Sequence, residues 1–514
     1  MSGFASIARG GGQGAGGSNT TNASETSQFG EALVAQLTPA AQATFVNGLN
    51  IINFITRSIG GGASVLSVSG SVVLQSGTAN TGSASVQMRR GLTYRAGQGS
   101  VLRGTAIFGP PVANTYQLIG FGNVECGYHF GYQGTDFGIL HVPDGIREVW
   151  KLDVGGAGVA NGASVVVTLN GQSVTRTING NNNENQTSWE LSYADWSNVG
   201  GGFVAEQFDG IVYFIALRSG ARNGTYSAKV GGVDIGTFTR FIAGQTPNLN
   251  FVSQSAWSID TMDGNGPSRM SLDHRTGNVY QIGFQYLGFG NARFSIEDEN
   301  TGLFQACHVL KLANTRTLPV LKDPHVSGVW SVANAGSTTG THMTGSSAAI
   351  FCEGEVIKNI GPAFSAFGVE LNVDNSPELP VLTIRSNRIF GNRVSYSELD
   401  ISGMSVAVIG AGNHYMAIRI YKNLRLTGPV NFTNVNESQS CASYDTAATG
   451  FDTNQNTLIA TYILPYGQTS NIDLKGDNFF LSVGESLTIT AIGSSGAAGA
   501  AADVSVAITW FEDQ

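Results

Sequence analysis

Acidic residues that lie close together are the best candidates for catalysis in this chain. Asp260 and Asp263 fall in a segment rich in glycine and asparagine, and Glu297–Glu299 follows an alternating apolar stretch. Glycoside hydrolysis needs two carboxyl groups across a scissile bond, one as the acid and one as the base or nucleophile. Aspartate beside asparagine and glycine is also typical of tight turns, because its side chain hydrogen-bonds the local backbone. The turn interpretation is favoured for both groups.

Patterns that could bind a metal are weaker. Asp452–Asn456 has the oxygen spacing that begins a calcium loop, but the glycine at the sixth place and the glutamate at the twelfth are missing. Cys126 and His129, like Cys307 and His308, lie at odd separations in strand-like stretches, so their side chains point to opposite faces. We interpret the four cysteines as small core residues. We predict no metal site and no cofactor.

Established catalytic motifs are missing as well. The sequence holds no G-x-S-x-G elbow, no H-E-x-x-H pair and no phosphate-binding loop. The seven histidines are scattered one at a time. We therefore predict no catalytic residues and expect that the protein is not an enzyme.

Aromatic side chains could stack on sugars. Trp189, Tyr193 and Trp196 recur at the spacing of one helical face, which is typical of a helix packed on a sheet. The aromatic residues of Tyr128–Tyr132 alternate as on a strand. Both spacings favour core positions over a binding surface.

Strand patterns dominate from Ala63 onward. Alternating apolar stretches are separated by Gly, Asn and Asp at intervals of roughly eight to twelve residues, which is typical of a sandwich or barrel. Asn170-Gly171 between two β-rich arms predicts a hairpin with a type I′ turn. A helix is expected around Gln186–Trp196. The segment Tyr116–Asn123 is echoed by Tyr280–Phe284, so we interpret residues 155–245 as an insertion into one β-sandwich.

The first residues differ from the rest of the chain in composition and in spacing of apolar residues. Residues 1 to about 27 are of low complexity, with a glycine-rich run at Gly10–Gly17, and are expected to form a flexible arm. Apolar residues at three- and four-residue spacing predict helices over residues 28–58, divided at Thr38-Pro39. Such a helical pair needs a partner on which to bury its apolar side.

The predicted fold class is mainly β: a multi-domain β-sandwich or jelly-roll-like protein with an inserted small α+β module and an N-terminal helical arm. The expected domains are an arm with helices for assembly, a sandwich body in two parts, the inserted module and a C-terminal β domain. Their limits are 1–62, then 63–154 with 246–424, then 155–245, and finally 425–514.

Composition excludes several functions. The 514 residues include 27 Lys and Arg against 36 Asp and Glu, a net charge of −9, so we expect no nucleic-acid partner. No apolar run is long enough for a transmembrane helix, and the first residues do not resemble a secretory signal, so membrane insertion is not expected. Only 12% of residues are charged, against about 25% in a typical soluble domain. Surfaces that meet other subunits and an uncharged Ser/Thr/Asn-rich β surface both fit this value.

Three stretches resemble predicted virion proteins of tailed bacteriophages and of large DNA viruses of algae. They are GYHFGYQGTDFGILH at Gly127–His141, REVWKLDV at Arg147–Val154 with the TLNG hairpin at Thr168–Gly171, and NVYQIGFQYLGFGN at Asn278–Asn291. The final DVSVAITW at Asp503–Trp510 is similar to the last strand of many such proteins. The resemblance implies a structural or adhesive virion component, but the class has no catalytic residues to transfer.

Our leading hypothesis is therefore a virion structural protein, a tail fibre or other tail appendage involved in host attachment. A capsid, vertex, tube or baseplate component and a glycan-degrading tail spike are the alternatives. The expected partners are further copies of the chain, a homotrimer in particular, other virion proteins bound through the N-terminal arm, and a glycan or receptor on the host surface. The expected location is the virion.

Overall fold

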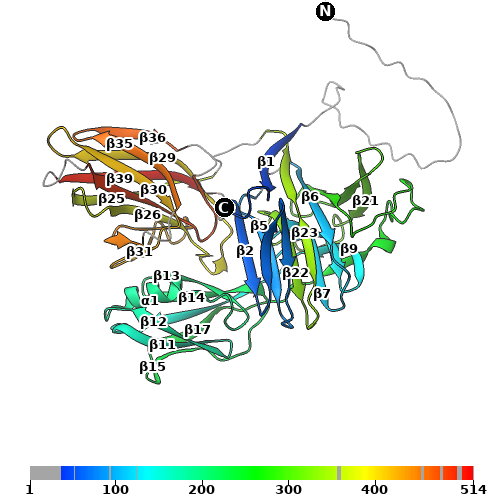
Figure 1. The fold of residues 1–514 in the computed structure, drawn as a ribbon, viewed down its shortest axis with the longest axis horizontal. Coiled ribbons are helices and arrows are strands. Elements are labelled where there is room, and N and C mark those ends of the chain that lie inside the picture. Colours follow the sequence, from blue (N-terminus) through cyan, green and yellow to red (C-terminus); the bar gives the residue numbers. More distant parts are fainter. Residues whose placement is uncertain are drawn as a thin grey trace, which may run out of the picture.

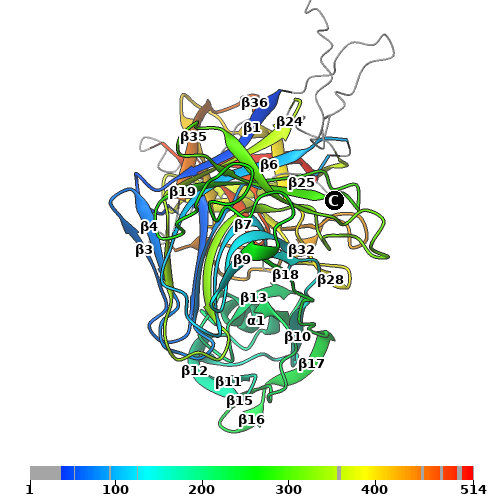
Figure 2. The same cartoon turned by 90° about the vertical axis from the view of Figure 1, so that its right-hand side faces the viewer.

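The chain folds into three β-sandwiches that lie side by side around a common centre (Figures 1 and 2). The structure is a computed structural model. It describes residues 36–50, 52–91, 94–95, 97–123, 125–355, 361–452, 457–474, 479–494 and 501–512. Among these residues, no helix has both the length and the apolar character needed to cross a membrane.

The first sandwich combines strands from before and after the middle of the chain. One sheet has the order β18 (Asn250–Ser253), β9 (Asp136–Val142), β8 (Gly127–Gln133), β7 (Thr115–Gly122), β22 (Ser327–Asn334), β5 (Ser83–Met88), β2 (Phe54–Ile59). The facing sheet has the order β21 (Phe304–Leu310), β20 (Ala292–Glu297), β19 (Asn278–Phe284), β6 (Ser100–Phe108), β23 (His342–Gly345), β4 (Ser71–Gln75), β3 (Ser64–Val68). In addition, β24 (Ser347–Glu353) pairs with β6 and β1 (Leu37–Thr44) pairs with β24. A short 3₁₀ helix, η1 (Gln254–Ala256), follows β18.

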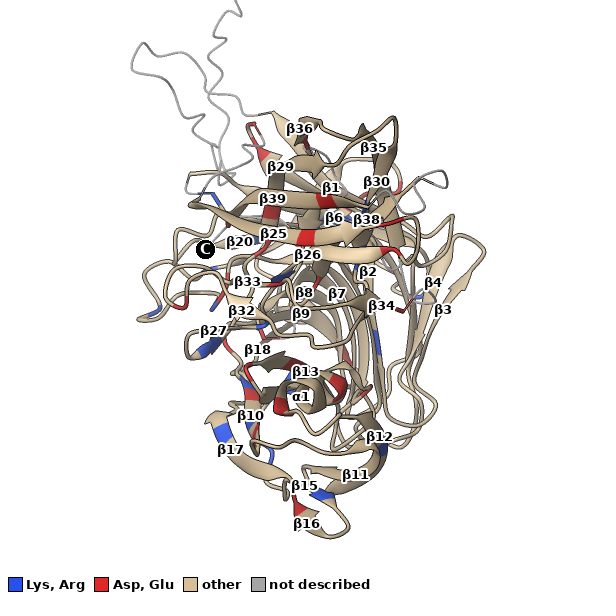
Figure 3. Ribbon diagram, turned by 90° about the vertical axis from the view of Figure 1, so that its left-hand side faces the viewer, with Lys and Arg blue, Asp and Glu red and all other residues tan. Residues whose placement is uncertain are grey.

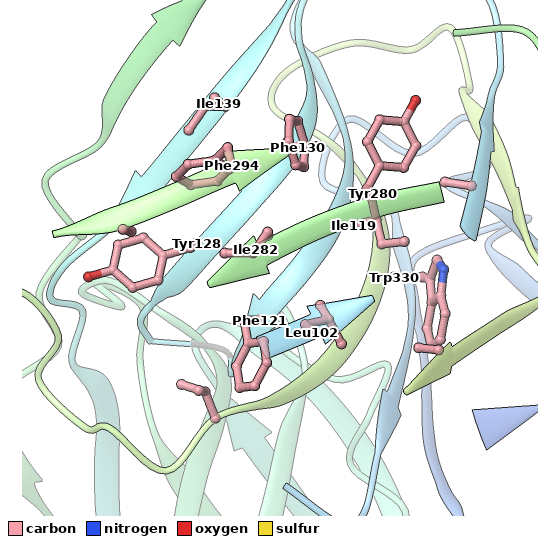
Figure 4. Packing of buried hydrophobic residues seen from close by; sticks show 14 of the residues in the cluster. Leu102, Ile119, Phe121, Tyr128, Phe130, Ile139, Tyr280, Ile282, Phe294 and Trp330 are labelled. Atoms are coloured by element: carbon pink, nitrogen blue, oxygen red, sulfur yellow. The ribbon is translucent and has the colours of Figure 1, made fainter. Parts of the chain in front are cut away.

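Aromatic side chains fill the space between these two sheets (Figure 4). Phe130 of β8 meets Tyr280 and Phe294 of the opposite sheet, with ring centroids 5.0 Å and 5.2 Å apart. Tyr128 and Tyr132, the alternate residues of the same strand, are also buried in this core. The core interpretation of Tyr128–Tyr132 is therefore confirmed.

The helices predicted over residues 28–58 are wrong where the structure describes this segment. Residues 37–44 and 54–59 are the strands β1 and β2, and residues 28–35 lie outside the described residues. Ala41, Ala43 and Phe45 are buried at a period of two, as β1 pairs antiparallel with β24. Pro39 lies at a β-bulge in this pairing, where a missing N–H is tolerated. Pairing with a distant strand therefore overrides a local helical spacing.

The second sandwich, residues 147–242, is the inserted module. One sheet has the order β13 (Phe203–Phe208), β14 (Ile211–Ser219), β10 (Arg147–Val154), β17 (Gly236–Ile242). The other has the order β12 (Gln172–Asn179), β11 (Asn161–Leu169), β15 (Ser227–Val230), β16 (Val233–Asp234). Its helix is α1 (Glu184–Tyr193), close to the stretch where a helix was expected.

One prediction for this module is confirmed and two are not. The hairpin prediction is confirmed, because Leu169 pairs with Gln172 and both Asn170 and Gly171 have positive φ. The α+β description is not upheld, since two four-stranded sheets with one short helix make a mainly β unit. The module also begins at β10 and not at residue 155, because β10 pairs with β14 and β17.

The third sandwich begins near residue 363. One sheet has the order β25 (Ala363–Val373), β39 (Ala502–Glu512), β29 (Leu399–Ile409), β36 (Thr469–Asp473), with β37 (Phe480–Leu481) beside β29. The other has the order β32 (Thr433–Asn434), β33 (Ala442–Asp445), β26 (Leu379–Ser386), β38 (Ser486–Gly493), β30 (Tyr415–Lys422), β35 (Thr457–Pro465). Two small ribbons pair β27 (Ile389–Phe390) with β28 (Arg393–Val394) and β31 (Leu426–Thr427) with β34 (Gly450–Phe451).

The boundary expected at residue 425 therefore divides this sandwich. Strands β25, β26, β29 and β30 lie before that position, yet they pair with β33, β35, β36, β38 and β39 behind it. Pairing partners far apart in the sequence leave no local mark of where the sandwich begins.

Candidate functional site

A cavity of about 860 Å³ lies where the three sandwiches meet. The first sandwich contributes β2 and the end of β5, and the module contributes the end of α1 and β13. The third sandwich contributes the segment after β26 and the loop between β37 and β38. The site therefore exists only in the assembled chain.

Arginine is the characteristic residue of the cavity wall. Arg57 and Arg89 come from the first sandwich, Arg147 from the start of β10, and Arg385 and Arg388 from the third sandwich. Arg147 and Arg385 are buried, and the other three are half-buried. This concentration of cations is unusual in a chain with a net charge of −9.

Two buried carboxylates that contact arginines of the cavity each bind a second cation as well. Glu485 lies 3.0 Å from the Arg89 guanidinium and 2.9 Å from Lys422 Nζ. Glu125 lies 3.0 Å from Lys322 Nζ and 3.5 Å from Arg147 Nε. Burial would lower the pKa of Arg147, but the nearby Tyr396 and Glu125 more than offset this effect and raise it.

Glu206 of β13 joins the module to the third sandwich. Both of its carboxylate oxygens accept a hydrogen bond of 2.9 Å from the backbone N–H of Arg388. Burial raises the pKa of Glu206, against the opposing effect of Arg385 and Arg388. The Arg385 guanidinium lies 3.8 Å from the centre of the Phe432 ring and donates a 2.9 Å hydrogen bond to the carbonyl of Gln207. The wall is thus held by charged groups that bridge separate sandwiches.

The carboxylates considered for catalysis do not line this cavity. Asp260 accepts hydrogen bonds from the backbone N–H groups of Met262 and Ser268 at 2.8 Å and 2.7 Å. Asp263 and Asp298 accept backbone N–H groups two residues further on, and these bonds lower the pKa of both carboxyl groups. These three aspartates stabilise tight turns by binding the local backbone, as the turn interpretation predicts.

The other singled-out residues are mostly core residues. Cys126, Cys307, Cys352 and Cys441 are buried with free thiols. The His308 ring accepts a 3.0 Å hydrogen bond from the backbone of Ser258. Over the described part of the chain, no three metal-ligating side chains lie together. Of the calcium-loop candidate Asp452–Asn456, residues 453–456 lie outside the described residues.

The aromatic residues predicted to share one helical face, Trp189, Tyr193 and Trp196, do not all pack in the same core. Trp196 is buried in the core of the module, and its indole N–H donates to the carbonyl of Leu191 at 2.8 Å. Trp189 packs against the third sandwich beside Phe432 and donates to the carbonyl of Leu426 at 3.2 Å. Tyr193 is half-buried, and all three aromatic side chains border the cavity.

Sequence reasoning missed the arginine-lined cavity. Its lining residues run from Ile55 to Ser486 in the sequence, and no spacing rule connects them. A partial signal exists in Arg385 and Arg388, a pair three residues apart at the end of a strand in a chain poor in charge.

Comparison with known proteins gives no family for the chain. No protein-family model and no curated protein matches it. Among solved structures, one from work on endo-acting O-glycanases of the human gut microbiota has a TM-score of 0.24 at 8% identity, covering 61% of this chain and 98% of that one. A Lotus tetragonolobus seed lectin has a TM-score of 0.22 at 10% identity, covering 62% and 100%.

A third structure covers more of the chain. The CBM22-1–CBM22-2 tandem domain of Paenibacillus barcinonensis Xyn10C has a TM-score of 0.19 at 9% identity, covering 93% of this chain and 99% of that one. TM-scores this low establish neither a common fold nor a common ligand, so the functional argument rests on the chain's own residues.

Proposed function

We propose that the protein is a non-catalytic component of a virion appendage that binds a host-surface glycan in the cavity between its sandwiches. The observation that carries the proposal is the cavity, whose volume of about 860 Å³ lies in the range of small-molecule sites, roughly 300–1,000 Å³. Its guanidinium, carboxylate, amide and hydroxyl groups match the hydrogen-bonding needs of sugar hydroxyls. The virion role is supported by the sequence resemblance of Gly127–His141, Arg147–Val154 and Asn278–Asn291.

A glycan array probed with the labelled full-length protein tests the binding part of this proposal. We expect selective binding to a small set of glycans and competition by the same glycans free in solution. Antibody labelling of intact particles tests the location, and we expect label on the tail. Absence of glycan binding would overturn the first part, and absence of label on particles the second.

Glycan cleavage is the second candidate function, and one observation favours it. The raised pKa of Glu206 is the property expected of a general acid at the cavity wall. Against it, both oxygens of Glu206 accept the backbone N–H of Arg388. Incubation with host polysaccharide should leave the chain length unchanged if the protein only binds. If the wild-type protein shortened the polysaccharide and Glu206→Gln did not, the hydrolytic function would be established instead.

Self-assembly is part of the proposal. The edge strand β25 exposes Phe367, Val369 and Leu371 on its outer face, with Phe367 and Leu371 each 59% exposed. The N-terminal arm proposed for attachment to other virion proteins lies outside the described residues. Light scattering coupled to size exclusion should give a homo-oligomer, and Phe367→Lys should shift it toward the monomer. A wild-type monomer would contradict this part, and a copy number of hundreds per particle would favour the capsid alternative.

A further inference from the structure

Two arginines of the cavity have no acidic partner in contact among the described residues. Arg57 of β2 donates a hydrogen bond of 3.2 Å to the Gln87 side chain, and only the backbone N–H of Arg388 contacts Glu206. Among the residues that the structure describes, no carboxylate oxygen lies within 4.0 Å of either guanidinium. Both side chains border the cavity and are half-buried.

The neighbouring acids are already engaged with other groups. Glu485 holds Arg89 and Lys422 at 3.0 Å and 2.9 Å, and it also accepts the backbone N–H of Ser482. A carboxylate that balances two cations cannot fully neutralise a third. The cavity lining holds five arginines against four acidic residues, Asp195, Glu206, Glu398 and Glu485, so positive charge is in excess there.

This excess of positive charge is unfavourable. Burial, together with repulsion from Arg147 and Arg388, lowers the pKa of Arg57 to about 10. Burial likewise lowers the pKa of Arg388, although Glu206 and Glu485 act in the opposite direction. Buried charges without a partner are destabilising, and such groups concentrate at functional sites. An anion in the cavity would relieve both the burial and the repulsion.

The backbone gives Arg388 a defined position. Gly484 has φ +82°, and a Cβ built there would lie 2.1–2.4 Å from the Cζ, Nη2 and Nε atoms of Arg388. A side chain at this position would displace the guanidinium, so glycine lets Arg388 pack directly against this loop. A planar guanidinium held in this way can present its parallel N–H groups to two oxygens of one anion.

We infer that the ligand of the cavity is an acidic glycan, whose carboxylate or sulfate group is bound by Arg57 and Arg388. The inference rests on the proposed function and adds the chemical class of the sugar. The two anions share the geometry that guanidinium groups recognise, so different probes must separate them.

Calorimetric titration of the full-length protein at low ionic strength tests the inference. The probes are tri-galacturonic acid for the carboxylate, a keratan sulfate tetrasaccharide, which carries no carboxylate, for the sulfate ester, and neutral maltotriose. We expect one acidic probe to bind at least about tenfold more tightly than the neutral one. Arg57→Met and Arg388→Met should each weaken that binding about tenfold, whereas Arg240→Met, on an exposed arginine of β17, should leave it unchanged.

Folding of each variant is checked by its circular dichroism and melting temperature. The wild-type protein alone gives a second test that needs no variant, because inorganic sulfate should compete with the acidic probe. Arg388→Lys keeps the charge but loses the parallel N–H groups, so an intermediate affinity is expected.

The outcomes separate the inference from the proposed function. Equal affinity for acidic and neutral glycans, unchanged in the arginine variants, would overturn the inference and leave glycan binding intact. If sulfate raised the melting temperature of the wild type but not of Arg57→Met, and no glycan bound, the anion site would stand and glycan binding would fall. If neither sulfate nor any acidic probe bound, the inference would be overturned.

Discussion

Two buried histidines of the first sandwich link its stability to pH. Burial lowers the pKa of His129 and of His141 from 6.5 to about 4. The folded chain therefore keeps both rings neutral while the unfolded chain takes up protons below pH 6.5. Their contribution to stability is complete above pH 6.5 and is lost as the pH falls toward 4.

This linkage predicts a specific effect of substitution. We expect His129→Gln to reduce the drop in the free energy of unfolding between pH 7 and pH 5 by roughly 2 kcal/mol. Urea unfolding at the two pH values measures the drop. His342→Gln, at an exposed position, is the control and should leave it unchanged. Equal drops in wild type and His129→Gln would contradict the prediction.

Gly484 allows backbone strain and side-chain collision to be separated. Gly484 and Gly171 share a φ of +82°, but only at Gly484 does a Cβ meet another group, the Arg388 guanidinium. Alanine should cost about 1–2 kcal/mol of unfolding free energy at Gly171 through strain alone. At Gly484 the added Cβ also displaces the flexible end of Arg388, so we expect the same loss from strain and a small further loss of about 0.5–1 kcal/mol, measured by urea unfolding. A smaller loss at Gly484 than at Gly171 would contradict the prediction.

At the scale of elements, strand β1 shows how pairing decides a conformation. Phe45 follows β1 and is fully buried, with its ring 4.9 Å from that of Phe54 and 5.3 Å from that of Trp330. Val46, the next residue, is 72% exposed. We expect Phe45→Ala to lower the free energy of unfolding by about 3–5 kcal/mol. Val46→Ala should change it by less than about 0.5 kcal/mol, and comparable effects at both positions would contradict this arrangement.

The same strand marks where sequence reasoning fails. Alternating aromatic residues predicted β8 correctly, because Tyr128, Phe130 and Tyr132 form one fully buried face of this strand. The resemblance of Tyr116–Asn123 to Tyr280–Phe284 also has a structural basis, since Phe121 and Phe284 meet across the core at 5.5 Å. In β1, alanine and threonine leave the period ambiguous, and only the distant partner β24 decides it.

At the scale of the whole molecule, the charges of this protein are few and unevenly placed. Most of the ribbon carries neither sign (Figure 3), whereas Arg57, Arg147 and Arg388 converge on one cavity. Each of them comes from a different stretch of sequence, so neither composition nor local spacing could predict the site. The candidate site follows from how the sandwiches are arranged, and its properties depend on that arrangement.

Trp189 is the side chain that best tests this dependence. It belongs to the module, yet it packs on Leu426 and Phe432 of the third sandwich, and the adjacent Glu190 lies 3.0 Å from the Arg425 guanidinium. Because the core of the module includes Trp196 but not Trp189, loss of Trp189 should leave the module folded but weaken its contact with the third sandwich.

We therefore expect Trp189→Ala to increase the radius of gyration in small-angle X-ray scattering and to divide a single thermal transition into two. Its affinity for the proposed glycan should fall, since the contact helps to hold the module, whose Glu206 binds the backbone N–H of Arg388, against the third sandwich. Trp189→Phe keeps an aromatic ring and loses only the hydrogen bond to Leu426, so it should resemble the wild type. A compact Trp189→Ala protein with unchanged ligand affinity would mean that the remaining contacts, among them Arg89 with Glu485, are sufficient to hold the cavity together.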